Sequence, residues 1–329
     1  MENANLSRRE KKLSRLSEIA VLYYNHNLTQ EQIAKRLFIS RTSISRMLRE
    51  AREAGIVEIK INIANERCRQ LEQVFRRKLD IEDAFIFNAN NAAGTVIKDL
   101  LCRNAAQCIN SMLSPGMTLG VTRGVTVAGM MEYLSENPPK NLDLKIVQLM
   151  GEVTDADPNV SSGDIIRSLL KVFGGKAYYL NAPMYVENDS IRNDLLREPI
   201  IRSTIKIGEK ADLIITGIGS LDRGKGLRDS IISKVADANT ITSLIAGGGV
   251  GNIFGHVFNI TGKLVAHPLN NRIISAGFDA LSKIKTLAVS YGSERGEAVL
   301  GAIRSKHVSI LFTDRLCAER VIALADNQH

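Results

Sequence analysis

Hydrophobic residues repeat with helical spacing in three short segments near the N-terminus. The residues that predict a first helix, over about residues 6–24, are Leu13, Leu16, Ile19, Ala20 and Tyr23. After the polar break "NHNL", Thr29 opens "TQEQ", which has the spacing of a capping box with Gln32. A short second helix is predicted there, with an inward face of Ile33, Ala34 and Leu37.

A three-residue turn, "FIS", leads into a third predicted helix with Ser40 as its N-cap. The inward residues of that helix are Ile44, Met47, Leu48 and Ala51, and Gly55 ends it. The segment "IVEIKINI" then alternates apolar and polar residues, as a half-buried strand does. A short helix, a tight turn and a second helix with a polar face predict a helix-turn-helix, and the strand predicts a wing.

The outward face of the third predicted helix carries short hydroxyl side chains near its start and arginines further along. Short side chains let a helix approach the floor of the major groove, where arginine reaches guanine or a phosphate. An amphipathic hairpin used only for packing is the alternative, but the capping box, turn, basic face and strand together favour DNA binding. We predict contacts with double-stranded DNA from Thr29, Gln30, Ser40, Arg41, Thr42, Ser43, Ser45, Arg46 and Arg49.

Beyond residue 63 the pattern changes to short apolar runs that alternate with amphipathic segments. The predicted strands are "DAFIF", "MTLGV", "LKIVQLM", "AYYLNAP", "DLIITGIG", "KTLAVSYG" and "VSILFTD", with predicted helices between them, one over about residues 190–210. This alternation indicates an α/β fold with a mostly parallel sheet and helices on both faces. We therefore predict a winged helix-turn-helix domain over residues 1–63 and an α/β domain over residues 64–329.

Positive charge is concentrated in the predicted helix-turn-helix segment. Residues 1–60 contain 12 Lys+Arg and 7 Asp+Glu, which gives a net charge of +5. The remaining residues contain 31 Lys+Arg and 28 Asp+Glu, which gives a net charge of +3. Because less than a fifth of the chain holds most of the excess, an anionic partner is indicated, although a solvated basic surface has the same composition.

Composition excludes several other classes of protein. No apolar run approaches the roughly 18 residues that span a bilayer, and the basic N-terminal stretch lacks the apolar core of a secretory signal. The four cysteines, Cys68, Cys102, Cys108 and Cys317, form no C-x-x-C pair and have no His at metal-ligand spacing. We expect free thiols in a cytoplasmic protein that uses no metal, no other cofactor and no membrane.

Four glycine-rich segments follow predicted strands: "GVTRGVT", "TGIGS", "AGGGVGNIFGH" and "SYGSERGEA". In open parallel sheets, ligands bind at the carboxyl ends of the strands. Backbone N–H groups at a glycine-rich turn that opens a helix bind anions, and an arginine can clamp the charge. The residues that we predict to bind a phosphorylated or carboxylated small ligand are Gly120, Thr122, Arg123, Gly124, Thr126, Gly217, Gly219, Asn252 and Arg295.

Signatures of other ligands and of catalysis are missing from these segments. "AGGGVGNIFG" does not match the dinucleotide pattern G-x-G-x-x-G, because Phe254 stands where the third glycine belongs. His256, His267 and His307 have no partner recognisable in the sequence, and there is no G-x-S-x-G motif. We assign no catalytic residue.

The stretch "LTQEQIAKRLFISRTSISRMLREAREAGIVEIKI" resembles the N-terminal module of the SorC-type bacterial transcriptional regulators, which carry a sugar-binding domain. Later landmarks occur in that family's order: "PGMTLGVTRGVTVAGMMEYL", "VQLMGEV", "ADLIITGIGS", "GNIFGHVFNITGKLV" and "KTLAVSYGSERGEAVLGAIRSKHVSILFTD". The resemblance covers nearly the whole chain. It implies a winged helix-turn-helix joined to an effector domain similar to sugar-phosphate isomerases and deaminases. It also implies phosphosugar effectors and assembly, usually to tetramers.

Several positions depart from the family's pattern. Arg295 stands where the resemblance implies a lysine, and Asn252 where it implies an aspartate that holds sugar hydroxyls. His256 replaces an arginine, and "TDE" becomes Thr313, Asp314 and Arg315. These differences indicate a different polyol or sugar phosphate, or a weakened response to one.

The sequence therefore predicts a homo-oligomeric DNA-binding regulator that responds to a phosphorylated sugar or polyol. One alternative is a sugar-phosphate isomerase or deaminase with an appended DNA-binding module, which needs a positioned acid or base. Another is a constitutive architectural DNA-binding protein, which needs no ligand loops. A ligand that regulates must bind the DNA-competent and incompetent states unequally.

Overall fold

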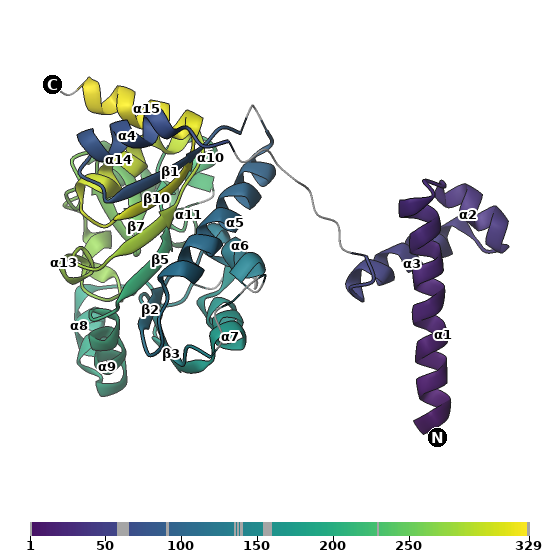
Figure 1. Cartoon of the computed structure of the whole chain (residues 1–329). Helices are drawn as coiled ribbons and strands as arrows, with labels where there is room; N and C mark the ends of the chain where they lie inside the picture. Colours follow the sequence, from purple (N-terminus) through teal and green to yellow (C-terminus); the bar gives the residue numbers. More distant parts are fainter. Residues whose placement is uncertain are drawn as a thin grey trace. The chain divides into compact units, whose positions relative to one another are not determined.

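Figure 1 shows the computed structural model of the chain, which describes residues 2–57, 66–89, 92–134, 136, 138, 141–153, 160–228 and 230–327. The chain divides into two compact units, Met1–Ile63 and Ala64–His329. Each unit has a hydrophobic core of its own. Among the described helices, none is both long enough and apolar enough to cross a membrane.

The N-terminal unit is a small helical module. Its elements are α1 (Glu2–Ala20), a π-helical turn (Val21–Asn25), α2 (Gln30–Leu37) and α3 (Arg41–Glu53). Its buried core comprises Ile19, Leu22, Ile33, Ala34, Ile44 and Leu48. The helix-turn-helix prediction is confirmed, with three helices close to the predicted segments. Most of the predicted wing, residues 58–63, lies outside the described residues.

The start of each helix of the pair is determined by the predicted capping residue. At α2, the Thr29 hydroxyl accepts a hydrogen bond from the Gln32 N–H at 3.2 Å, and the Gln32 side chain accepts one from the Thr29 N–H at 2.8 Å. At α3, the Ser40 hydroxyl accepts the Ser43 N–H at 3.1 Å. The two helices therefore begin where the sequence places their caps.

The larger unit is built on a seven-stranded sheet in which every pair of neighbours is parallel. In spatial order its strands are β1 (Asp83–Phe87), β10 (Ile310–Asp314), β9 (Thr286–Val289), β5 (Leu213–Gly217), β2 (Thr118–Val121), β3 (Leu144–Gln148) and β4 (Gly175–Tyr178). The central strands β9, β5 and β2 are almost entirely apolar, as strands buried on both faces must be. The predicted α/β fold is confirmed.

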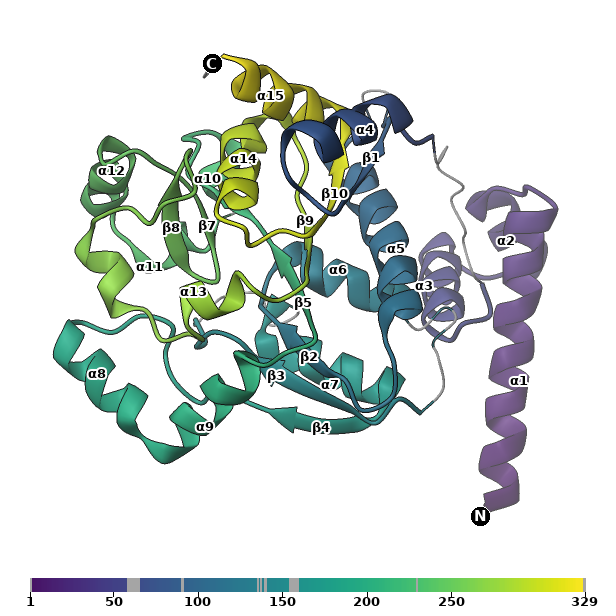
Figure 2. The same cartoon turned by 60° about the vertical axis from the view of Figure 1, so that its left-hand side comes forward.

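Helices cover both faces of this sheet (Figures 1 and 2). One face is covered by α5 (Gly94–Met112), α6 (Val125–Leu134) and α7 (Ser162–Phe173). The other is covered by α4 (Arg69–Lys78), α9 (Pro199–Gly208), α14 (Gly296–Arg304) and α15 (Arg315–Asp326), which enclose the largest core. The remaining helices are α8 (Asp189–Arg197), α10 (Lys225–Arg228), α11 (Ile232–Val235), α12 (Ala238–Ala246) and α13 (Phe278–Leu281), with single turns at Pro268–Arg272 and Ser293–Arg295.

A second, antiparallel sheet corrects one sequence expectation. "AGGGVGNIFGH" is not a loop at the end of a parallel strand, because its middle forms β7 (Gly249–Ile253). This strand turns back into β8 (His256–Asn259) and also pairs with β6 (Gly219–Ser220). A Cβ atom at Gly251 would lie 2.6 Å from the Cβ of Ala298 on α14. Glycine there permits the sheet to pack closely against α14 rather than to bind a ligand.

Two further boundaries differ from the sequence prediction. The strand predicted at "AYYLNAP" begins and ends earlier, because β4 covers Gly175–Tyr178. The helical stretch predicted over residues 190–210 is two helices, because Pro199 begins α9 and cannot continue α8. Figure 2 shows α8 and α9 beside the β4 end of the sheet.

The core of the helix-turn-helix module gives a first prediction. Ile44 on α3 is fully buried, so Ile44→Ala leaves a cavity and lowers the free energy of unfolding of the module by about 2–5 kcal/mol. Amide hydrogen exchange of α3 in the full chain measures this loss. The neighbouring exposed residue supplies the control, since Ser45→Ala changes protection by less than about 0.5 kcal/mol. Equal protection in both variants would contradict the assigned core.

Candidate functional site

The carboxyl ends of the central strands β2, β5 and β9 open into a cavity of about 370 Å³. Loops and helix starts that follow these strands form its wall, together with the first turn of α5, the β7–β8 turn and α11. Parallel strands all end at the same edge of a sheet, so this edge collects residues that are far apart in the sequence. The cavity is the candidate ligand site.

Two hydroxyl groups meet at the ends of β2 and β5. The Thr122 and Thr216 hydroxyls are 3.0 Å apart, and both side chains are buried. Arg123 follows directly and is only 8% exposed. Its Nε lies 3.3 Å from a carboxylate oxygen of Glu152, which orients the guanidinium. The end of β2 thus supplies a cation whose position is determined by a carboxylate.

The starts of α5 and α6 both line the cavity. Gly94 and Thr95 belong to the first turn of α5, which has no side-chain cap, and Gly124 precedes α6 with a φ of 145°. The Cys102 thiol on α5 donates a hydrogen bond to the Thr126 carbonyl at 3.4 Å, and burial raises the pKa of this thiol to about 12. Helix N-termini carry unpaired N–H groups and partial positive charge, so two of them favour an anion.

Arg295 reaches the cavity from the loop after β9. Its guanidinium donates a hydrogen bond to the Ile218 carbonyl at 3.3 Å. The loop is held by Asp314 at the end of β10, which accepts the Gly292 N–H at 2.7 Å. Burial raises the pKa of the Asp314 carboxyl, and the backbone N–H groups that bind its charged form oppose this rise. Ser290 is 2% exposed in the cavity wall, and its hydroxyl has no hydrogen-bond partner among the described residues.

Asn252 on β7 forms the opposite wall. Its side-chain N–H donates to the Ser230 hydroxyl at 2.7 Å, which leaves the amide oxygen as an acceptor. A Cβ atom at Gly219 would lie 2.3 Å from the Asn252 amide nitrogen, so glycine is required for this contact. Lys234 on α11 also lines this side.

The cavity wall is cationic. Its charged side chains are Lys98, Arg123, Lys234 and Arg295, and no carboxylate or histidine is among the described lining residues. Such a wall favours a ligand that carries negative charge. Metal binding has less support: no group of three or more His, Cys, Asp or Glu side chains in the described part of the chain is placed to hold an ion.

Eight of the nine residues predicted for the ligand site line this cavity: Thr122, Arg123, Gly124, Thr126, Gly217, Gly219, Asn252 and Arg295. Gly120 does not. It lies within β2, where a Cβ atom would be 2.9 Å from the Leu149 side chain, so its role is packing. Sequence reasoning missed Thr95, Lys98, Ser230 and Lys234, because they lie on helices or outside glycine-rich segments. It also missed Ser290, although this residue begins the glycine-rich segment "SYGSERGEA". The available signal for Lys98 was its position in "GTVIK", about one helical turn after Gly94 and Thr95 at the start of α5.

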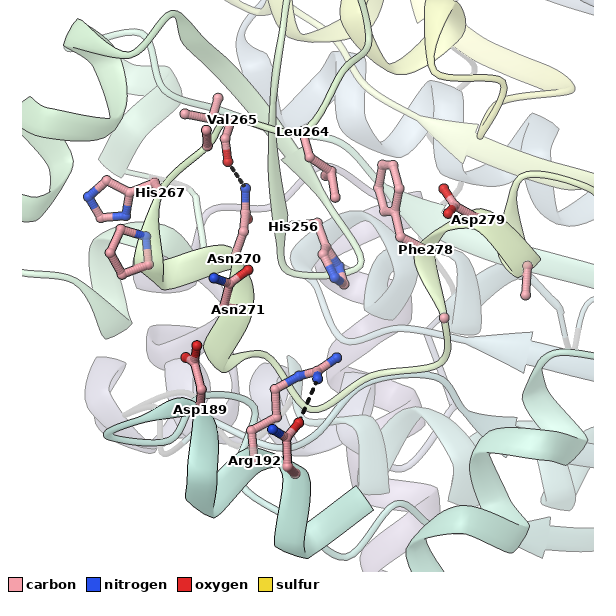
Figure 3. Close-up of a pocket in the computed structure, with 15 residues that line it drawn as sticks. Asp189, Arg192, His256, Leu264, Val265, His267, Asn270, Asn271, Phe278 and Asp279 are labelled. Carbon is pink, nitrogen blue, oxygen red and sulfur yellow. Dashed lines mark hydrogen bonds between the residues drawn. The ribbon is translucent and has the colours of Figure 1, made fainter. Parts of the chain in front are cut away.

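A second, larger hollow of about 910 Å³ lies beside α8 and the Pro268–Arg272 turn (Figure 3). Two of the polar side chains that line it already have hydrogen-bond partners. Arg192 donates to the Ile273 carbonyl and to Asn193, and Asn270 donates to the Val257 and Val265 carbonyls. Burial lowers the pKa of His256 to about 4, so its ring is neutral near pH 7. The smaller, cationic cavity is therefore the candidate ligand site.

The residues predicted to contact DNA lie on α3 and at the start of α2. All nine are exposed or half-buried, and Thr29, Gln30 and Arg41 line one shallow hollow of about 690 Å³. The Arg46 side chain is 65% exposed and its Nε lies 3.8 Å from the Glu50 carboxylate. Glu50 also pairs with Lys12 of α1 at 2.8 Å, and this partner lowers the pKa of the Glu50 carboxyl. The predicted DNA-contacting face of α3 is therefore accessible, and Glu50 links α3 to α1.

Comparison with known proteins identifies the family. Residues 64–323 match the model of the "Putative sugar-binding domain" family, and residues 19–67 match that of the MarR family. The first match covers more than half of the chain. The chain belongs to the SorC-type family of sugar-binding-domain transcriptional regulators.

Several relatives of this SorC-type regulator are named transcriptional regulators. It is 27% identical to the transcriptional regulator LsrR of Enterobacter sp. (strain 638), over 94% of this chain and 93% of the relative. It is 24% identical to the sorbitol operon regulator of Klebsiella pneumoniae and 24% identical to the deoxyribonucleoside regulator of Bacillus subtilis, in each case over 93% of this chain and 96% of the relative.

A solved structure supports the same fold. The full-length sorbitol operon regulator SorC from Klebsiella pneumoniae superposes with a TM-score of 0.70 at 23% identity, over 95% of this chain and 99% of SorC. This SorC-type regulator therefore shares the fold of both the helix-turn-helix region and the α/β sheet unit with SorC.

The support beneath Arg295 gives a second prediction. Asp314→Ala removes the acceptor of the Gly292 N–H, so we expect the free energy of unfolding of the full chain to fall by about 1–3 kcal/mol. Asp314→Asn keeps an acceptor oxygen, so its free energy of unfolding falls less than that of Asp314→Ala. The exposed Asp326, paired with Lys78, serves as the control, because Asp326→Ala costs at most about 1 kcal/mol. Denaturant unfolding measures all three; equal losses for both alanine variants would refute the role of Asp314.

Proposed function

We propose that this regulator binds an operator through α2 and α3, and that a phosphorylated sugar or polyol in the cationic cavity controls this binding. The observation that carries the proposal is the convergence of four cationic side chains and two helix N-termini on one cavity at the strand ends. The chain acts as a homo-oligomer, a tetramer by its family resemblance, held together by the α/β unit in the cytoplasm.

The chemistry of the cavity favours a phosphorylated ligand over a neutral one. Lys98, Arg123, Lys234 and Arg295 all line the cavity, and a phosphate adds charge-assisted interactions with them that a neutral sugar does not. A phosphate group supplies two negative charges and three acceptor oxygens for the N–H groups of α5 and α6. The Asn252 amide oxygen and the Ser290 hydroxyl are suited to the hydroxyl groups of a sugar or polyol.

The same wall argues for binding rather than catalysis. Isomerases and deaminases of sugar phosphates need a positioned acid or base within reach of the substrate carbon. No carboxylate or histidine belongs to the described lining residues, which leaves Lys98, Lys234 and Tyr291 as the acids or bases there. The position where the family resemblance implies an aspartate carries Asn252. The names of two relatives refer to sorbitol, which is a polyol, and to deoxyribonucleosides, which contain a sugar, so both are compatible with an effector that carries sugar-type hydroxyl groups.

Regulation requires that the ligand bind two states of the protein unequally. The ligand site and the helix-turn-helix belong to different compact units of the chain. An oligomer provides the connection, because a ligand that changes how the α/β units associate changes the spacing of the two helix-turn-helix modules on a two-fold-related operator.

The DNA half of the proposal predicts a steep salt dependence and a base-reading role for Arg46. Wild-type full-length chain selects a two-fold-related duplex from a random pool, and its affinity falls strongly between 50 and 200 mM salt, on the order of tenfold or more. Arg46→Ala reduces the difference in binding free energy between the selected duplex and random duplex by roughly 1–3 kcal/mol. Arg202→Ala, an exposed arginine on α9, leaves this difference unchanged. An unchanged difference in Arg46→Ala would remove Arg46 from base readout.

The ligand half predicts different effects at Arg295 and Asn252. Arg295→Ala weakens binding of the best phosphorylated sugar from a thermal-shift screen by about 1.5–3 kcal/mol, whereas Arg295→Lys retains much of it. Asn252→Asp changes which sugar binds best. Arg192→Ala, in the larger hollow, has no effect. Calorimetric titration of the four variants measures this, with DNA affinity as a folding control. Equal affinity of wild type and Arg295→Ala would place the phosphate elsewhere.

A further inference from the structure

Phe38 occupies the turn between α2 and α3, and its side chain is 94% exposed. This is the largest exposed fraction among the large hydrophobic side chains of the described residues. The two neighbours of Phe38, Leu37 and Ile39, are half-buried and pack on the core of the module. The chain therefore turns Phe38 outward at a point where the residues on either side turn inward.

The backbone of Phe38 is also unusual. Its φ of 55° and ψ of 41° lie in the left-handed region, where it serves as the C-cap of α2 and its N–H bonds to the Ala34 carbonyl. Glycine and asparagine adopt this conformation readily, and an aromatic residue does so at a cost in free energy. Phe38 therefore costs the isolated module backbone strain, and its exposed ring returns no stabilisation through burial, which indicates a function outside the module.

The surroundings of Phe38 indicate what it contacts. Lys35 and Arg36 lie in the last turn of α2, Arg41 begins α3, and all three are exposed. Ser40 and Thr42, two of the residues predicted to contact DNA, follow within four positions. An exposed apolar ring, with exposed cations three or fewer positions away in the sequence, is complementary to a polyanion with apolar edges. Duplex DNA has such edges in its thymine methyl groups and deoxyribose rings.

We propose that Phe38 is a DNA-contacting residue, whose ring packs against the wall of the major groove beside the start of α3. This inference rests on the proposed function, because it needs the helix-turn-helix to bind an operator. Phe38 supplies an uncharged contribution to affinity, next to the cations that contact phosphates. An acidic protein partner at the same surface is the competing occupant, and the experiment separates the two.

The test uses full-length chain and a duplex that wild type has selected from a random pool. Phe38→Gly removes the ring and relieves the left-handed strain, so the melting temperature stays the same or rises while affinity for the duplex falls about tenfold or more, the factor expected for burying one aromatic side chain. Phe38→Leu keeps an apolar contact and therefore loses less affinity for the duplex than Phe38→Gly does. Val21→Ala, which shortens another exposed apolar residue of the module, leaves affinity unchanged.

Salt dependence identifies the kind of contact. Phe38→Gly leaves the slope of log affinity against log salt unchanged, because no phosphate contact is lost, whereas Arg36→Gln reduces the magnitude of the slope by about one. If wild type selects no duplex, the DNA half of the proposed function fails. If wild type binds and Phe38→Gly binds equally well, or loses affinity only because it unfolds, the role of Phe38 alone is refuted. Loss of regulation in cells with full DNA affinity would assign Phe38 to a protein partner instead.

Discussion

Parallel strands end at one edge of their sheet, and the ligand site of this regulator depends on that constraint. Residues that follow β2, β5 and β9 are far apart in the sequence, yet they meet around one cavity because their strands are neighbours. Each loop contributes only one or two groups, a hydroxyl, a helix N-terminus or a guanidinium. Together these groups favour an anion, as we propose, although none of them is specific for an anion alone.

Residues behind the cavity wall orient the groups that line the cavity. Asp314 holds the loop that carries Arg295, and Glu152 positions Arg123. The thiol of Cys102 supports the carbonyl of Thr126 from behind the start of α6. These residues do not line the cavity, so their contribution to ligand binding is through the geometry of those that do.

The sequence predicted most of the fold, because helical spacing, apolar runs and caps are local signals. Thr29, Gln32 and Ser40 determined the helix starts within one residue. The site was predicted where glycine and arginine follow a strand, and missed at Lys98 and Lys234, whose helices look ordinary in the sequence and reach the cavity only through tertiary packing. Glycine misled at Gly120 and Gly251, because a glycine required by close packing looks the same in a sequence as one that binds a ligand.

The amide side chain of Asn252, which donates a hydrogen bond to Ser230, has a consequence for how the cavity responds to pH. An amide has no ionisable proton, so this position holds the same charge at every pH, whereas the aspartate implied by the family resemblance would be an acid facing the ligand. For a phosphorylated ligand, the proton that changes the charge in the cavity then belongs to the ligand itself. The second ionisation of a phosphate monoester has a pKa of about 6. A regulator of this kind would lose sensitivity to its effector as the cell interior acidifies, without any change in the protein.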